Sequence, residues 1–151
     1  MKLSAQAGDV LVAYALGSCL GLAIYDPVAR VGGLLHVMLP SSSIDPRKAA
    51  ERPYMFVDTG VPRLFQECYR VGADKRRLVV KVAGGASINR DLADDSFRIG
   101  ARNYTMLRRL LSRNSVRLHG VDVGGIQSRT VSLEIGTGNV TVKSQGTTTR
   151  L

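Results

Sequence analysis

The sequence predicts a protein of the α/β or α+β class, with a largely antiparallel β core and helices outside it. Short segments rich in β-branched residues outnumber the segments with helical periodicity. Two amphipathic segments interrupt the series of strands, and Gly-Gly pairs separate several of the elements. Because 151 residues is the size of one ordinary domain, we expect a single domain spanning residues 1–151.

The first half of the chain contains three expected strands, at Val10–Tyr14, Leu20–Tyr25 and Val31–Met38. Proline favours a tight turn and cannot donate in a strand ladder, so Pro27 predicts that the second and third strands form an antiparallel hairpin. The polar stretch 40–53 that follows is expected to be an irregular surface loop.

The second half alternates helical and extended segments. Apolar residues recur at helical spacing over Tyr54–Val71, and again over Ala101–Arg113. Between these two helices, Leu78–Ala83 has the composition of a strand, and the tail from Gly146 onward is expected to fray. Three closing strands are expected at Leu118–Val123, Thr130–Ile135 and Asn139–Lys143.

Basic residues outnumber acidic ones by 21 to 12, which gives a net charge of +9 and favours an acidic partner. The basic residues are scattered and the aromatic residues are few, so the pattern argues against a nucleic-acid partner. Two cysteines cannot form the dense pairing of small secreted scaffolds, and reduced thiols fit a cytoplasmic protein.

The amino-terminal segment imitates a bacterial lipoprotein signal, because Lys2 and the apolar run Val10–Leu16 precede Cys19. The run has only about seven residues and Asp9 abuts it, which is short for such a signal. The apolar pattern also continues past the cysteine, and no stretch has the length of a membrane span. We therefore expect no membrane insertion, and an intact-mass measurement on the native protein would decide between the two interpretations.

The predicted hairpin brings a thiol and an imidazole together. If residues 26–29 form the turn, Tyr25 faces Arg30 and Cys19 falls opposite His36. Directly opposed residues have Cβ atoms about 4.5–5.5 Å apart, which is close enough for an imidazole to take the proton of a thiol. Gly17 and Gly21 beside the cysteine would let a substrate approach, and the flanking amides could donate to an oxyanion.

A structural role is the competing interpretation for each of these side chains. A cysteine among apolar residues is usually a small buried hydrophobe, and we expect this role for Cys68 on the apolar face of its helix. A histidine in a strand is usually a partnered structural residue, and we expect this role for His119. Without the hairpin geometry, the same interpretation would be favoured for Cys19 and His36.

Three segments of the first half form a distinctive set of motifs: Leu16-Gly17-Ser18-Cys19-Leu20-Gly21, Tyr25-Asp26-Pro27-Val28-Ala29 and Gly33-Leu34-Leu35-His36-Val37-Met38-Leu39-Pro40. In these segments the chain resembles the chemoreceptor glutamine deamidase family CheD, and the cysteine and histidine motifs, with their mutual spacing, are highly specific. The resemblance runs nearly from end to end, with further matches at Asp58-Thr59, Lys81 with Gly84-Gly85-Ala86, Ile99 to Asn103, and Asp122 with Gly124-Gly125 and Arg129.

The resemblance implies hydrolysis of chemoreceptor glutamines to glutamate, through a thioester on Cys19 with His36 as base. It implies a fold similar to the cytotoxic necrotizing factor type of deamidase, in which two mixed, largely antiparallel β-sheets pack together with helices outside. It also implies two partners, the cytoplasmic domains of chemoreceptors (methyl-accepting chemotaxis proteins) and the phosphatase CheC. We expect no cofactor and no metal, because the sequence has no phosphate loop, dinucleotide fingerprint or metal-ligand spacing.

A position that the family uses in catalysis departs from the family pattern. The family has a catalytic threonine six residues before the cysteine, and this chain has Ala13 there. Tyr14 and Ser18 are nearby hydroxyls that could orient the histidine, and Ser18 and Gly17 are candidates for support of an oxyanion. Adjacent side chains on a strand point to opposite faces, so neither hydroxyl is an automatic replacement for a group at position 13. The alternative function is therefore a catalytically weakened module that binds receptors or CheC.

Overall fold

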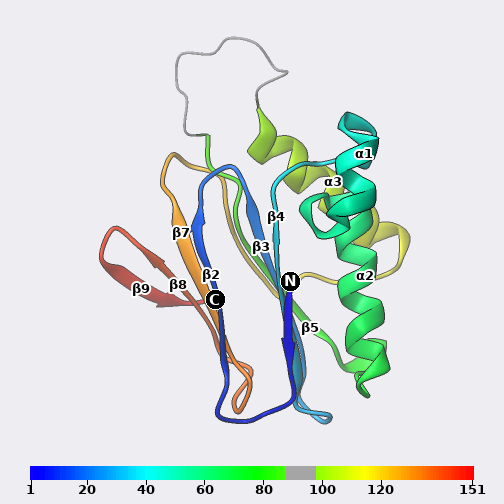
Figure 1. Cartoon of the computed structure of the whole chain (residues 1–151). Helices are drawn as coiled ribbons and strands as arrows, with labels where there is room; N and C mark the ends of the chain where they lie inside the picture. Colours follow the sequence, from blue (N-terminus) through cyan, green and yellow to red (C-terminus); the bar gives the residue numbers. More distant parts are fainter. Residues whose placement is uncertain (88–97) are drawn as a thin grey trace.

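The computed structural model describes residues 1–87 and 98–151. Two β-sheets pack face to face, and helices cover the outer face of the larger sheet (Figure 1). The larger sheet has five strands in the order β1-β4-β3-β5-β6, and the smaller has four in the order β2-β7-β8-β9. The expected α+β class, with two packed sheets and external helices, is confirmed.

The larger sheet is mixed. Its strands are β1 (Lys2–Ser4), β3 (Leu20–Asp26), β4 (Val31–Val37), β5 (Val79–Gly84) and β6 (Gly120–Val123). Among these strands only β5 and β6 pair in parallel, and the other pairs are antiparallel. The short strand β1 was not predicted, because three residues are too few to show a periodic pattern.

The smaller sheet consists of β2 (Val10–Leu16), β7 (Arg129–Glu134), β8 (Val140–Ser144) and β9 (Thr147–Arg150), all paired antiparallel. The prediction that the tail frays is wrong, because β9 pairs with β8 over its whole length. Its three threonines are β-branched and suit an exposed edge strand, whereas a search for apolar residues overlooks them.

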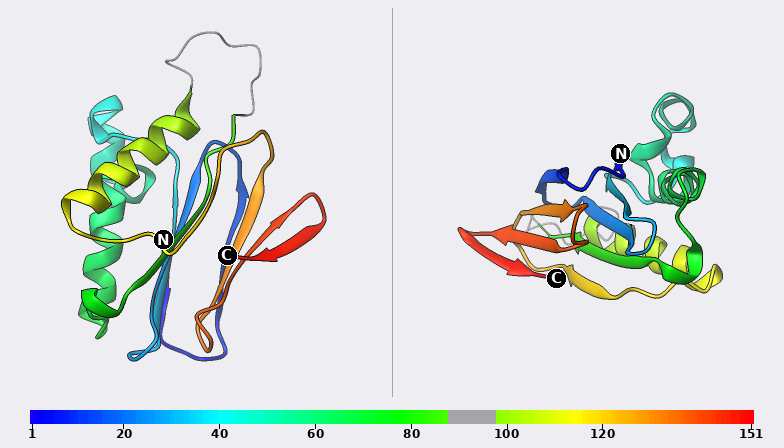
Figure 2. Two further views of the ribbon diagram at one scale, coloured as in Figure 1. Left: turned by 180° about the vertical axis from the view of Figure 1, so that it is seen from behind. Right: turned by 90° about the horizontal axis from the view of Figure 1, so that it is seen from below.

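The two long helices are α2 (Val57–Arg70) and α3 (Ile99–Arg113), both close to the predicted ranges, and both lie on one side of the larger sheet (Figure 2). None of the helices in the described residues is long and apolar enough to cross a membrane. Within residues 1–87 and 98–151, single-turn 3₁₀ helices lie at Ser42–Ile44, Pro53–Met55 and Lys75–Arg77.

The stretch 40–53 is not simply irregular, because it contains the short helix α1 (Pro46–Glu51). The Asp45 side chain caps this helix by accepting a hydrogen bond from the Lys48 N–H, and Pro46 occupies the first turn. An N-cap residue followed by proline is a helix-start signal, so the sequence contained the evidence for this helix.

The core has two layers, and the central strands contribute to both. Leu22 and Ile24 of β3 face the helices, whereas Ala23 and Tyr25 face the smaller sheet. Every residue of β3 is buried for this reason. In β4, Leu35 faces the helices and its neighbour Leu34 faces the smaller sheet, so even-numbered residues of β4 point into the layer between the sheets.

The β3–β4 hairpin has a different register from the predicted one. Tyr25 pairs with Gly32 rather than Arg30, because β3 continues to Asp26 and the connection is residues 27–30. The Asp26 carboxylate accepts hydrogen bonds from the N–H groups of Val28 and Ala29, which places the turn one residue later. The error moves each pair by two residues, so every side chain stays on its predicted face.

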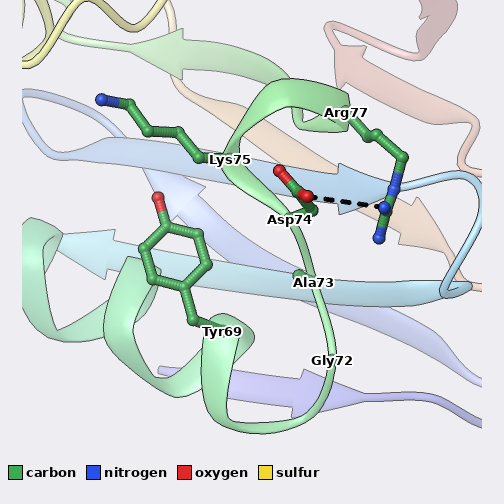
Figure 3. Close-up of a pocket in the computed structure, with 6 residues that line it drawn as sticks. All are labelled: Tyr69, Gly72, Ala73, Asp74, Lys75 and Arg77. Carbon is green, nitrogen blue, oxygen red and sulfur yellow. Dashed lines mark ion pairs between the residues drawn. The ribbon is translucent and has the colours of Figure 1, made fainter.

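The buried carboxylate of Asp26 lies at the turn end of this hairpin. The Asp26 side chain is fully buried and also accepts from the Asp74 N–H and the Arg77 guanidinium. These donors hold the pKa of Asp26 well below its usual range, although burial alone would raise it. Asp74 also pairs with Arg77, and both line a shallow cavity beside Tyr69 and Lys75 (Figure 3). This cavity lies at the opposite end of β3 from Cys19.

Candidate active site

Cys19 and His36 lie near one end of the larger sheet, on the face turned toward the smaller sheet. His36 pairs with Gly21 in the β3–β4 ladder, and Cys19 directly precedes β3. The Cys19 side chain packs against the cluster between the sheets. The two residues are therefore diagonal neighbours, whose Cα atoms in such a ladder lie about 7–8 Å apart. The predicted direct opposition is wrong, but the shared face was correctly predicted.

Gly21, which pairs with His36, lies where side chains of the smaller sheet pack closely against β3. A Cβ at this position would lie 2.6 Å from Cδ1 of Leu16 and 3.5 Å from Cγ2 of Val131. The first contact would require the end of the Leu16 side chain to shift, whereas the second is an ordinary van der Waals contact. The prediction that Gly21 lets a substrate approach finds no support here, because the Leu16 and Val131 side chains fill the space beside its Cα.

Burial sets the protonation states of the pair. Partial burial raises the pKa of the Cys19 thiol above its ordinary value, and a hydrogen bond from its own backbone N–H partly opposes this. Burial lowers the pKa of His36, and the positive amino terminus of Met1 lowers it further. At neutral pH the resting pair is therefore a thiol and a neutral imidazole. His36 Nε2 is buried and has no hydrogen-bond partner among the described residues.

The backbone around Cys19 is held by the segment that follows β5. The Cys19 carbonyl accepts from the Gly85 N–H at 2.8 Å, and the Gly17 carbonyl accepts from the Ala86 N–H at 2.8 Å. Gly84 has φ of 115°, and a Cβ there would collide with the Cys19 carbonyl oxygen. Gly84 and Gly85 therefore allow tight backbone packing beside Cys19.

The residues proposed for oxyanion support differ in what their amides can do. The Gly17 N–H donates to the Ala15 carbonyl at 3.0 Å, so this amide is already engaged. The Ser18 N–H has no acceptor within residues 1–87 and 98–151. Of the two candidates, only Ser18 therefore has a backbone donor available for a developing negative charge.

Ala13 is buried on the inward face of β2, in the same cluster that touches Cys19. It pairs with Val131, and the register then shifts before Leu16. Tyr14 is 68% exposed and points away from this layer, as strand alternation predicted. A hydroxyl at position 13 would therefore point between the sheets, toward the layer that contains His36.

Asn103 is the polar residue that the sequence interpretation missed. It is fully buried in the first turns of α3. Its side-chain Nδ2 donates to the Ser18 carbonyl at 3.1 Å and to the Met38 carbonyl at 3.0 Å. The signal was present, because an asparagine lies on the buried face of an amphipathic helix together with Leu107 and Leu111.

Cys68 and His119 have the structural environments that were expected. Cys68 is 1% exposed and packs under Gly33, and burial raises the pKa of its thiol to about 12. His119 lies outside the site, and its Nδ1 accepts a hydrogen bond from the Val80 N–H at 3.1 Å. Neither side chain is near the diagonal pair.

These environments predict how the two thiols react. We expect iodoacetamide to label Cys19 with a pH midpoint above that of an ordinary thiol, and to leave Cys68 unlabelled in the folded protein. The reason is that the thiolate is the reactive form and burial disfavours it. Labelling followed by peptide mass spectrometry across a pH series measures both sites. A midpoint for Cys19 well below neutral pH would contradict the arrangement of thiol and neutral imidazole.

The fold and the site together define a two-sheet α+β protein that holds a half-buried thiol and a half-buried imidazole on one face of its central hairpin. The comparisons with known proteins agree on one family. Residues 38–144 match the family model described as CheD chemotactic sensory transduction. This chain belongs to the CheD family.

Curated relatives share most of their length with the chain. It is 54% identical over 145 residues to the protein named "probable chemoreceptor glutamine deamidase CheD 1" of Syntrophus aciditrophicus, covering 96% of this chain and 89% of that protein. It is 51% identical over 138 residues to a "probable chemoreceptor glutamine deamidase CheD" of Solibacter usitatus, covering 91% and 80%. A protein of the same name from Archaeoglobus fulgidus is 40% identical over 136 residues, covering 90% and 84%.

Proposed function

We propose that this chain is a protein-glutamine deamidase, an amidohydrolase that converts glutamine side chains of bacterial chemoreceptors to glutamate and releases ammonia. Its relatives carry that name, and they match nearly the whole chain. The observation that carries the proposal is the placement of Cys19 and His36 on one face at one end of the central hairpin. The substrate would be the cytoplasmic domain of a chemoreceptor, so the activity belongs in the cytoplasm.

In the proposed mechanism Cys19 is the nucleophile and His36 is the general base. The neutral imidazole takes the thiol proton at Nε2, and the thiolate attacks the carbonyl carbon of the glutamine side chain. The tetrahedral oxyanion that forms would accept a hydrogen bond from the Ser18 N–H. His36 then returns the proton to the leaving ammonia, and a thioester remains on Cys19.

Water completes the reaction. His36 removes a proton from water as it attacks the thioester carbonyl, and the thiolate leaves as the glutamate carboxyl forms. The thiolate recovers its proton from the imidazolium, which restores the resting pair. Because the resting residues are diagonal neighbours, the first proton transfer requires the Cys19 side chain to rotate toward the imidazole.

The direct test is ammonia release from a purified receptor cytoplasmic fragment. Mass spectrometry of the digested fragment then locates each glutamine whose mass rises by the difference between an amide and an acid. Ammonia without a converted receptor glutamine would point to another amide substrate. No ammonia and no conversion, from a chain that binds the fragment, would leave the deamidase proposal without support.

Ala13 favours a second candidate function, a module that binds receptors or CheC with weakened catalysis. A threonine at this position would place a hydroxyl between the sheets, where it could hold the imidazole in one orientation. With Ala13 that hydrogen-bond partner is missing. Binding of the fragment or of CheC with no turnover would support this second function.

Restoring the hydroxyl is expected to increase turnover. We predict that Ala13→Thr raises the single-turnover rate about tenfold, which corresponds to about 1.4 kcal/mol of transition-state stabilisation. The measurement is ammonia release by the two proteins on the same receptor fragment, after equal binding has been checked. Val12→Thr, which adds a hydroxyl at the neighbouring position on the opposite strand face, is the matched control. Equal rates for Ala13→Thr and the natural chain would show that another group already orients His36.

A further inference from the structure

Asn103 connects two chain segments that carry the candidate catalytic pair. Ser18, whose carbonyl accepts one of its hydrogen bonds, directly precedes Cys19. Met38, whose carbonyl accepts the other, is two residues beyond His36. Both bonds originate from the same nitrogen, so a single side-chain amide ties the start of β3 to the end of β4.

We propose that Asn103 is a positioning residue, which fixes the spacing between the Cys19 segment and the His36 strand by donating to both of their backbones. The proposal deepens the proposed function, and its kinetic part rests on that function. Asn103 would not contact the reacting atoms themselves. It acts through the two segments that hold them.

The chemistry of the two acceptors selects an amide. Two carbonyl oxygens require two N–H donors, and the Nδ2 group of asparagine supplies both from one atom. A carboxylate of the same size offers only acceptors, and an apolar residue of the same size offers nothing. Either replacement would leave the Ser18 and Met38 carbonyls without this donor.

The helix that carries Asn103 is itself fixed against the site. A Cβ at Gly100 would collide with the Gly85 carbonyl oxygen, so the start of α3 lies directly on this segment. Gly85 and Ala86 donate to the Cys19 and Gly17 carbonyls. The cysteine segment is therefore bonded by backbone amides on one side and by the Asn103 side chain on the other.

The remaining polar atom of Asn103 argues against a role in stability alone. Its Oδ1 is buried and has no hydrogen-bond partner among the described residues. A buried acceptor without a partner is costly and rare in folded proteins, so its retention needs a reason. Placement of the two carbonyls supplies that reason.

The test compares Asn103→Ala and Asn103→Asp with two controls on the same helix. Asn114→Ala removes a similar amide, which donates to the Leu110 carbonyl at 2.8 Å on the exposed end of α3. Leu107→Ala removes buried packing one turn from Asn103 and loses no hydrogen bond. Each protein is measured by single-turnover deamidation of a receptor fragment and by the pH profile of iodoacetamide labelling, with Cys68 as the internal reporter of unfolding.

We expect both Asn103 variants to lose about a hundredfold in the single-turnover rate, the effect of a misplacement of about 1 Å, while fragment binding is retained. We also expect the labelling midpoint of Cys19 to move down toward that of an ordinary thiol, because a loosened segment is better hydrated. Cys68 should stay unlabelled. The Leu107 and Asn114 variants should keep the natural labelling profile for Cys19.

Three results would overturn the positioning role. The first is a natural labelling profile and rate in both Asn103 variants. The second is a change in the labelling midpoint and rate of Leu107→Ala that equals the change in the Asn103 variants at the same loss of thermal stability. The third is joint labelling of Cys19 and Cys68, which would show a general loss of packing. If the natural chain has no deamidase activity, the labelling arm still decides the role of Asn103, and only the proposed function fails.

Discussion

Cys19→Ala and His36→Ala are each expected to abolish receptor deamidation while leaving the thermal midpoint close to that of the natural chain. In the proposed mechanism, Cys19→Ala removes the nucleophile and with it the thioester route, and His36→Ala removes the base and leaves the thiol protonated at neutral pH. Both side chains are only partly buried, so their loss removes little packing. Ammonia release and a thermal melt on the same samples measure the two quantities.

Cys68→Ala is the matched control, because it removes the same thiol from a buried site. It should keep the deamidation rate and lower the free energy of unfolding by about 1 kcal/mol or more. Turnover retained by Cys19→Ala would exclude Cys19 as the nucleophile. Activity lost equally in all three variants would indicate damage to the fold instead.

Asp26→Ala is expected to produce the largest loss of stability, about 3 kcal/mol in the free energy of unfolding. The fully buried carboxylate accepts from three backbone N–H groups and from Arg77, and all of these donors would lose their partner. Urea unfolding of the two proteins at neutral pH gives the difference. Because Asp26 lies at the opposite end of β3 from Cys19, the deamidation rate below the melting transition should not change.

The pH dependence of this effect has a definite sign. The pKa of Asp26 is lower in the folded protein than in the unfolded chain, so its contribution is complete above the ordinary carboxyl value of about 4. It is lost as the pH falls further toward the folded pKa. The stability difference between the natural chain and Asp26→Asn should therefore shrink below about pH 4, and a constant difference would contradict the assignment.

The elements that sequence analysis predicted well have strong periodicity or composition. The helices α2 and α3 and the strands β2 to β8 fall in this group, because their apolar residues recur at regular spacing. The elements that were missed, β1, β9 and α1, are short or polar. Strand pairing stabilises β1 and β9, and an N-cap stabilises α1. The predicted register of the β3–β4 hairpin was wrong because Asp26 belongs to β3, and only the buried contacts of Asp26 reveal this.

The candidate site could be predicted in part. The motifs and the predicted hairpin correctly placed Cys19 and His36 on one face of the sheet. This placement depends only on the alternation of side chains along each strand, which a shift of two residues does not change. The Asn103 contacts and the engaged Gly17 amide could not be predicted, since they depend on how distant segments meet in three dimensions. The catalytic roles themselves stay predictions until the variants are measured.

In the proposed mechanism, the central position of β3 limits how a substrate can reach the Cys19 thiol. The strand is hydrogen-bonded to β4 on one edge and β5 on the other, and it is covered on both faces. Separating such a strand from its neighbours costs much free energy. The substrate amide therefore has to approach Cys19 from the end of the sheet. The length of the receptor side chain then decides which amides can reach the thiol. An asparagine carries its amide one methylene closer to its own helix than a glutamine does, and it would stop short of a half-buried sulfur.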